Sequence, residues 1–216
     1  KANDSSLRVV SMQAVTLDGT LAKNQQETNE QRLEYGFGCD RDRLLLENET
    51  LAAEAIIIGG KSFCAAKGRI LPEKKLTRKP LIVVFSNSRQ CEELLIESKE
   101  RGDRVLLVNQ EGKVHFPALK DLVFAYKDSP PGRAICQELE KKGFHKVLLL
   151  GGSMLNSLFY KEKLVDELML TIAPVLLANK GAIGLIEPHL DQPIQMTLIN
   201  SAVDQNHLFL TYQVQK

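Results

Sequence analysis

Two glycine pairs stand where an apolar run gives way to a hydroxyl-bearing segment, in "AIIIGGKSF" (residues 55–63) and "VLLLGGSMLNSLF" (residues 147–159). Glycine lets a backbone approach a phosphate group closely, and the unpaired N–H groups of a first helical turn attract the anion. The apolar residues after Gly152 have helical spacing, so Ser153 is in position to cap a helix. Each glycine pair therefore suits a phosphate-binding turn, although a tight turn without a ligand would have the same sequence.

A third apolar run ends in "VFSNSRQ" (residues 84–90), where Ser86, Ser88 and Arg89 supply two hydroxyls and a guanidinium for a phosphate monoester. By itself Arg89 equally fits a solvated helix start. Because ligands of open α/β sheets bind at the carboxyl ends of strands, three anion-suited strand ends indicate a nucleotide with more than one phosphate group. Neither glycine pair has the spacing of a P-loop or of an ordinary Rossmann turn, which disfavours both sites.

The elements that must position these groups follow from the pattern of apolar runs. Short, continuously apolar runs suit strands that are covered on both faces of a largely parallel sheet. They are predicted at residues 7–15, 55–59, 80–86, 104–108, 146–152 and 165–177. Helices are predicted between them, at residues 40–53, 62–66, 88–101, 131–142 and 153–161.

The last segment, "MTLINSAVDQNHLFLTYQV", predicts two strands at residues 196–203 and 207–214 that are joined by a polar turn. The sequence thus predicts an α/β fold with a mixed, mostly parallel sheet, flanking helices and a C-terminal antiparallel hairpin. We expect one domain over residues 1–216, with residues 1–6 as a flexible N-terminal segment. Long polar loops at residues 23–35, 67–79 and 178–193 are candidate walls of a site.

Composition excludes several classes of protein. The 216 residues are 44% hydrophobic and 25% charged, and 28 Lys and Arg balance 27 Asp and Glu, so no basic field attracts nucleic acid or an anionic membrane. No apolar run approaches the roughly 20 residues of a membrane span. The four cysteines are scattered, without a Cys-x-x-Cys pair or a His at ligand spacing, which predicts no metal site, no disulfide framework and a reducing cytoplasm.

The order of these motifs resembles the reductase domain of riboflavin biosynthesis, the C-terminal half of the bacterial bifunctional deaminase-reductases. The resemblance runs from Leu7 onward and includes "AVTLDGTLA" (residues 14–22), "AIIIGGKS" and "PLIVVFS". Its most specific part lies between residues 151 and 177, with "LVDEL" and "IAP" in place. The resemblance implies a dihydrofolate reductase-like fold and an NADPH-dependent hydride transfer to a small-molecule substrate.

The resemblance also implies where NADPH binds. The second glycine turn would hold the pyrophosphate, Ala14 would lie near the nicotinamide, and Ser86 with Arg89 would lie at the 2′-phosphate. The complete predicted set is Ala14, Gly59, Gly60, Lys61, Ser62, Ser86, Arg89, Gly151, Gly152, Ser153, Met154 and Leu155. Family analogy further implies a homodimer, which would also cover the long apolar run at residues 165–177.

The substrate half departs from the family. The riboflavin enzymes usually have a Glu before the glycine turn, an Arg late in the helix after the "TLDG" loop and an Asp-Asp-Pro segment after the second strand. Here those places hold Leu150, Thr50 and "AAKGRILPEK" (residues 65–74). We therefore expect Thr50 and Leu150 to line the pocket of a different small heterocycle or carbonyl compound.

Two other functions stay open. "GRILP" is similar to the corresponding loop of dihydrofolate reductases, although the segment after "TLDG" lacks their usual Leu-Pro-Trp. A non-catalytic nucleotide-binding module that keeps the fold would also tolerate the loss of substrate-binding residues.

The reaction also needs a proton donor. By the resemblance, Asp18 and Asp40 are the carboxylates nearest the expected pocket. Each also has a structural interpretation, Asp18 as a turn former and Asp40 as a helix N-cap. The aromatic residues available near the substrate are Tyr35 and Phe37.

Overall fold

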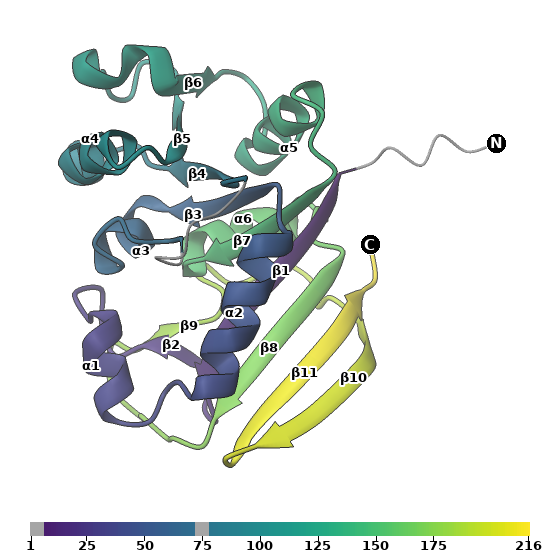
Figure 1. Cartoon of the computed structure of the whole chain (residues 1–216). Coiled ribbons are helices and arrows are strands. Elements are labelled where there is room, and N and C mark those ends of the chain that lie inside the picture. Colours follow the sequence, from purple (N-terminus) through teal and green to yellow (C-terminus); the bar gives the residue numbers. More distant parts are fainter. Residues whose placement is uncertain (1–6, 72–77) are drawn as a thin grey trace.

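The computed structural model describes residues 7–71 and 78–216, so the predicted flexible segment at residues 1–6 and residues 72–77 of the loop at 67–79 lie outside the described part. A nine-stranded sheet forms the centre of the molecule, in the order β10-β11-β8-β1-β7-β3-β4-β5-β6 (Figure 1). Its strands are β1 (Arg8–Thr16), β3 (Ala55–Gly59), β4 (Leu81–Phe85), β5 (Arg104–Gln110), β6 (Val123–Tyr126), β7 (Lys146–Gly151), β8 (Glu167–Ala173), β10 (Met196–Asp204) and β11 (His207–Val214). A separate pair joins β2 (Thr20–Ala22) to β9 (Ile183–Gly184).

Strands β8 to β6 in that order run parallel, whereas β11 is antiparallel to both β8 and β10. The turn between β10 and β11 has two residues, Gln205 and Asn206, both with positive φ, as a tight hairpin requires. This arrangement confirms the predicted mixed, mostly parallel sheet with a C-terminal hairpin.

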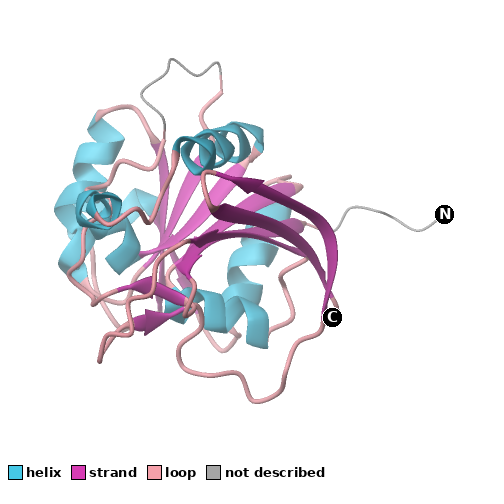
Figure 2. Cartoon of the chain, turned by 90° about the horizontal axis from the view of Figure 1, so that it is seen from below, coloured by secondary structure: helices cyan, strands magenta, loops and turns pink. Residues whose placement is uncertain are grey.

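Helices cover both faces of the sheet (Figure 2). They are α1 (Asn29–Glu34), α2 (Asp40–Ala52), α3 (Gly60–Ala65), α4 (Glu92–Glu100), α5 (Pro131–Lys141) and α6 (Ser153–Lys161), with 3₁₀ turns η1 (Arg89–Cys91) and η2 (Pro117–Leu122). On one face, Leu155 and Phe159 of α6 pack in a cluster with Val9 and Ile57. On the other face, Leu45 of α2 packs against Met12 and Leu148.

Local signals explain where the predicted boundaries differ. The run at residues 165–177 continues only to Ala173 as strand β8, because Pro174 has no N–H for the ladder. The predicted N-caps Asp40 and Ser153 are both wrong, since Cys39 and Gly152 take the extended backbone of that position. Asp40 and Ser153 are instead the first residues of their helices.

Elements α1, β2, β6 and β9 fall in stretches without a strong apolar period, which the sequence pattern leaves as loops. No helix among the described residues is both long and apolar enough to cross a lipid bilayer.

Candidate active site

The sheet order brings together the strand ends that carry the predicted cofactor residues. Because β1, β7, β3 and β4 are consecutive and parallel, their carboxyl ends lie side by side along one edge. Neighbouring strands are about 4.8 Å apart, so the ends of β1 and β4 are separated by roughly 14 Å. An extended ligand that lies along this edge would therefore meet Ala14, both glycine turns and Ser86 in sequence.

The two glycine turns contact each other directly. The Gly152 N–H donates to Ser62 Oγ over 3.0 Å, and a Cβ added to Gly152 would lie 2.8 Å from that oxygen. A Cβ on Gly60 would lie 2.8 Å from Ser86 Oγ, so this turn also packs closely against the end of β4. Close packing thus favours glycine at positions 60 and 152, which the sequence alone could only suggest. The Gly151–Gly152 peptide bond is cis.

The buried amide side chains of Gln13 and Asn156 lie next to the second glycine turn. Gln13 Nε2 donates to the Leu149 carbonyl over 3.1 Å and to Asn156 Oδ1 over 3.3 Å. Asn156 Nδ2 in turn donates to the Leu185 carbonyl over 3.0 Å. Sequence reasoning missed both residues, and the signal that could have found them is a single amide inside an apolar strand or helix. Gln13 and Asn156 therefore position the turn.

The first turn of α6 has the donors that an anionic group needs. Ser153 is buried, and its Oγ makes no hydrogen bond within the described chain. Burying a hydroxyl without a partner is costly, so an acceptor or donor from a ligand would stabilise it. The adjacent helix start carries a partial positive charge. The residues at this turn therefore fit a pyrophosphate.

The end of β4 differs from the expected arrangement in one respect. The Ser86 hydroxyl donates to the Ser88 carbonyl over 2.9 Å and accepts from the Ser88 N–H over 3.3 Å, so it shapes the turn. Ser88 and Arg89 are exposed next to it. Arg89 Nε donates to Glu92 Oε2, and this hydrogen bond raises the pKa of Arg89. The exposed part of the guanidinium remains available to an anion.

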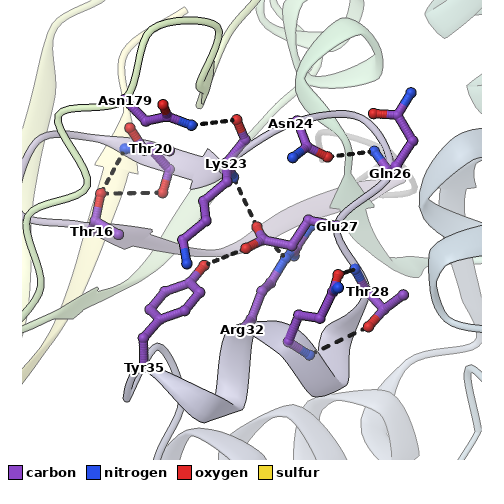
Figure 3. A network of polar contacts seen from close by, with 11 residues as sticks. Thr16, Thr20, Lys23, Asn24, Gln26, Glu27, Thr28, Arg32, Tyr35 and Asn179 are labelled. Atoms are coloured by element: carbon purple, nitrogen blue, oxygen red, sulfur yellow. Dashed lines mark hydrogen bonds and ion pairs between the residues drawn. The ribbon is translucent and has the colours of Figure 1, made fainter.

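The segment after β2 is fixed to helix α1 by a buried carboxylate (Figure 3). Glu27, whose side chain is 3% exposed, accepts from the Lys23 N–H over 2.8 Å and from the Tyr35 hydroxyl over 3.0 Å, and it pairs with Arg32 over 3.5 Å. Burial, followed by the hydrogen bond to Glu27, raises the pKa of Tyr35 to about 12. Tyr35 is thus a neutral structural hydroxyl.

Two lysines connect this segment to α3. Lys61 Nζ donates to Gln25 Oε1 over 2.6 Å, and Lys67 Nζ donates to Glu30 Oε1 over 2.9 Å. These contacts place residues 23–35 beside the helix that follows the first glycine turn. Lys61, predicted to contact the cofactor, is therefore already partnered by an amide, and it forms no ion pair with a carboxylate among residues 7–71 and 78–216.

The two predicted proton donors are held differently. Hydrogen bonds from the Thr16 hydroxyl and the Ala178 N–H lower the pKa of Asp18 to about 2, so Asp18 carries no proton near neutral pH. Asp40 is exposed at the start of α2 and pairs with Arg43 over 3.2 Å. The contact of Asp18 with Thr16 agrees with its interpretation as a turn former, and its contacts with Leu177 and Ala178 also anchor the loop after β8.

The two predicted substrate residues lie on the face of the sheet that α2 covers. Leu150 falls at a shift in the β3–β7 register and, like Leu45 and Ile70, packs against the buried cluster that includes Met12 and Leu148. Thr50 is 1% exposed in the last turns of α2. Because α2 begins beside the carboxyl ends of β1 and β8 and extends away from them (Figure 1), Thr50 is far from that edge along the helix.

A third carboxylate at the start of α2, Asp42, was missed by the sequence analysis. The Thr171 hydroxyl of β8 donates to Asp42 Oδ1 over 2.6 Å. Burial raises the pKa of Asp42, while the Thr171 hydrogen bond and the charge of His207 act in the opposite direction. Thr171 is the register partner of Ala14, so Asp42 lies at the edge where the nicotinamide is expected. The segment "CDRDR" (residues 39–43) contains both Asp40 and Asp42. Only their contacts show that Asp42 faces the sheet while Asp40 is exposed.

Parallel strands with an antiparallel C-terminal hairpin and glycine turns at the carboxyl edge define the dihydrofolate reductase-like class of reductases. Within that class, the chain belongs to the RibD C-terminal domain family, whose model matches residues 8–210. These findings confirm the resemblance to the riboflavin-biosynthesis reductases.

Individual relatives agree with this assignment. The riboflavin biosynthesis protein RibD of Chlamydia muridarum is 27% identical over 184 residues, which are 81% of this chain and 48% of that protein. The diaminohydroxyphosphoribosylaminopyrimidine deaminase/5-amino-6-(5-phosphoribosylamino)uracil reductase of Thermotoga maritima superimposes with a TM-score of 0.74 at 15% identity, over 97% of this chain and 57% of that one. The chain thus spans about half the length of these relatives.

A dihydrofolate reductase of Enterococcus faecalis, solved in complex with NADP(H), superimposes with a TM-score of 0.58 at 13% identity, over 97% of each chain. At this identity the likeness shows the fold alone.

Proposed function

We propose that the chain is an NADPH-dependent reductase that transfers a hydride to a small heterocyclic substrate, as the 5-amino-6-(5-phosphoribosylamino)uracil reductases do. The observation that supports this most is the contact between the two glycine turns, where the Gly152 N–H donates to Ser62 Oγ. The strand order β1-β7-β3-β4 puts this contact between Ala14 on one side and Ser88 and Arg89 on the other. An extended dinucleotide would meet these groups in that order.

Each part of the cofactor has residues that suit it. The first turn of α6, with the unpartnered Ser153 Oγ, would hold the pyrophosphate. Ser88 and the exposed guanidinium of Arg89 would hold the 2′-phosphate. Bound NADPH supplies the hydride, and the chain supplies orientation and a pocket that excludes water.

The substrate is proposed to differ from the phosphoribosylamino-uracil. Leu150 replaces a charged Glu, and this loss leaves a polar substrate group unpaired at a cost of about 1 to 3 kcal/mol, which weakens binding roughly 5- to 150-fold. Thr50, in the place of the family Arg, is buried in the last turns of α2 and adds nothing to this figure. Dihydrofolate is the second substrate to test, because "GRILP" (residues 68–72) is similar to the corresponding loop of dihydrofolate reductases. Pro72, the last residue of this motif, lies outside the described residues.

Calorimetry with NADPH and with NADH tests the cofactor, and loss of the reduced-nicotinamide absorbance with pyrimidine, pterin and folate substrates tests turnover. We expect NADPH to bind more tightly than NADH and to be oxidised by one of these substrates. Absence of NADPH binding would refute the proposal. Binding without turnover on any heterocycle would instead favour a non-catalytic nucleotide-binding module.

We also propose a homodimer, but not because the apolar run at residues 165–177 needs a cover. Strand β8 is paired on both sides, by β1 and β11, so the apolar run at residues 165–177 is not an open edge. Strand β10 is one of the two edges of the nine-stranded sheet, and Leu198, Ile199 and Val203 on it are at least half exposed. Apolar edge strands are normally covered, and a second copy of the chain would cover this one.

The four free cysteines support the proposed reducing cytoplasm.

A further inference from the structure

We propose that an open pocket at the amino ends of the parallel strands binds a small organic anion with a flat apolar body, such as an aromatic carboxylate, and that Lys163 selects its charge. The pocket has a volume of about 480 Å³, which is within the usual range of small-molecule sites. It lies between the C-terminal end of α6, the segment before β10 and the end of β11. The inference goes beyond the proposed reductase function, which uses the carboxyl edge of the sheet.

The pocket is separate from the residues proposed to hold the cofactor. Helix α6 begins with Ser153 at the second glycine turn and ends at Lys161. Nine residues of α-helix span about 14 Å, so the two ends of α6 are well apart. Tyr160 and Lys161 line the pocket at the far end from the glycine turn, and β11 ends beside them near the C-terminus of the chain (Figure 1). A ligand in this pocket would therefore not occupy the cofactor edge.

The floor of the pocket is apolar and continuous with the core. Tyr160, Val165 and Val214 are buried members of the main core cluster. Leu190 and Ile194 are half buried and pack against the same cluster. Covering such side chains removes apolar surface from water, which favours binding of a flat apolar group.

The wall formed by residues 190–195 is held in place at both ends. The Ser157 hydroxyl of α6 donates to the Pro188 carbonyl over 2.8 Å, just before this wall. The Gln215 N–H donates to the Gln195 carbonyl over 3.0 Å at its other end. Because these bonds exist without a ligand, the pocket is preformed, and binding does not have to order the wall.

The rim of the pocket has an excess of positive charge. One carboxylate, Asp191, faces three lysines, Lys161, Lys163 and Lys216. Lys161 is 3.8 Å from Asp191, and Lys216 pairs with Asp166 over 2.6 Å. Lys163 makes no ion pair with any residue in the ranges 7–71 and 78–216. The positive charge that the carboxylates leave unbalanced is therefore that of Lys163.

The backbone at Lys163 is unusual for a lysine. Lys163 has φ +55° and follows the last turn of α6. Its N–H donates to the Tyr160 carbonyl over 3.1 Å, and the Leu164 N–H donates to the Phe159 carbonyl over 3.0 Å. This pair of bonds is the Schellman motif, in which glycine is the usual residue at the left-handed position. A lysine is less favourable there than glycine, so its side chain needs a separate explanation.

Two other helices of the chain end with the same pair of bonds. After α5 the left-handed residue is Gly143, with φ +77°. After α3 it is Lys67, with φ +52°, and its ammonium group pairs with Glu30 over 2.9 Å. The charge of Lys67 thus has a partner within the protein, whereas the charge of Lys163 faces the pocket. An anionic ligand would supply the missing partner.

The chemistry of the rim decides which ligands the pocket prefers. An ammonium group has donors only, so it binds the acceptor oxygens of a carboxylate, sulfonate or phosphate. A charged acceptor forms a stronger hydrogen bond with it than a neutral amide oxygen does. A neutral ligand with the same rings would keep only the apolar contacts, and a cation would be repelled.

The probes are 2-naphthoate and naphthalene-2-carboxamide, which share the same rings and differ in charge. Each is titrated into the ¹⁵N-labelled full chain, whose amide chemical shifts give both the dissociation constant and the location. We expect naphthoate to bind with a dissociation constant on the order of 1 mM or below. It should bind about 5- to 10-fold more tightly than the carboxamide, between the values for an exposed ion pair and a hydrogen bond to a charged group.

The shifted amides should be those of residues 160–165, 190–195 and 214–216, and sodium chloride should reduce the preference for naphthoate because the charge is exposed. Equal binding of the two probes, tighter binding of the carboxamide, or no binding of naphthoate overturns the inference. Shifts confined to the exposed strand β10 or to the glycine turns place the ligand elsewhere and also overturn it.

A variant and a matched control test the role of Lys163. K163G removes the ammonium group and should remain folded, because glycine suits the positive φ. It is expected to reduce the preference for naphthoate to about twofold or less and to leave carboxamide binding unchanged. The control K67G makes the same replacement at the equivalent position after α3 and should keep the full preference. A preference that survives in K163G, or that K67G abolishes equally, overturns the inference.

Saturation with NADPH separates this inference from the proposed function. The dissociation constant of naphthoate should be the same within about twofold with and without NADPH, because the two sites share no residue. Displacement of naphthoate by NADPH would assign it to the cofactor edge and overturn the inference. If NADPH does not bind at all, the reductase proposal fails and the anion pocket stands.

Discussion

Substitution of Gly151 by alanine tests how tightly the second glycine turn is built. Gly151 has φ +76°, and an added Cβ would lie 2.8 Å from Asn156 Oδ1 and 3.0 Å from Gln13 Oε1. The left-handed backbone costs an L-residue about 1 to 2 kcal/mol, and crowding in a packed interior costs about 1 to 3 kcal/mol. We therefore expect G151A to lower the free energy of unfolding by about 2 to 5 kcal/mol. Relief of the crowding must shift the turn, which should weaken NADPH binding at least about tenfold.

The matched control is G143A. Gly143 lies between α5 and β7, at the amino ends of the parallel strands and therefore opposite the glycine turns. Gly143 has nearly the same φ, +77°, but a Cβ there would meet no atom within 4 Å. Urea denaturation should show only the backbone cost, about 1 to 2 kcal/mol, and calorimetry should show unchanged NADPH binding. The reasoning is refuted if G151A loses no more stability than G143A and binds NADPH like the wild type.

The remaining predictions concern the cofactor, the assembly, the substrate and pH. Calorimetry should show that R89A weakens NADPH by about 1 to 3 kcal/mol and spares NADH; equal losses for both would remove Arg89 from the 2′-phosphate. Sedimentation at micromolar concentration should show a dimer, and a single 24.1 kDa species would contradict this. With the phosphoribosylamino-uracil, kcat/KM should fall below roughly 10⁴ M⁻¹s⁻¹, the lower end of the usual enzyme range; a higher value restores that substrate. The folded-state pKa of Asp18, about 2, is below its ordinary 3.8, so its hold on Ala178 is complete above pH 3.8 and is lost as the pH falls through about 2. The hydrogen-exchange protection factor of the Ala178 N–H should decline only as the pH falls from 3.8 through about 2. A decline that begins at higher pH would mean that other groups hold the loop.

Much of this architecture is local in origin and could be predicted from the sequence. The runs that become β3 and β11 have the predicted bounds. β3 is a short, almost continuously buried run, and β11 starts directly after the polar turn of the hairpin, so each has a plain local signal. Helix α6 also has its predicted bounds, since its apolar spacing starts directly after the glycine pair. Short elements such as α1 and β9 were missed, because six and two residues carry too little periodicity.

The site depends on contacts between distant residues, and these only the tertiary structure decided. The glycine pairs and Ser86 could be recognised one by one, but their alignment follows from the strand order β1-β7-β3-β4. Gln13 and Asn156, 143 residues apart, support the turn through hydrogen bonds that no local pattern encodes. Likewise, the hydrogen bond between Thr171 and Asp42, which are 129 residues apart, distinguishes Asp42 from the neighbouring Asp40. The sequence determined which segments form strands, helices and turns, because burial and backbone preference act within a few residues. Which side chains face one another was decided by packing, which joins segments regardless of their separation along the chain.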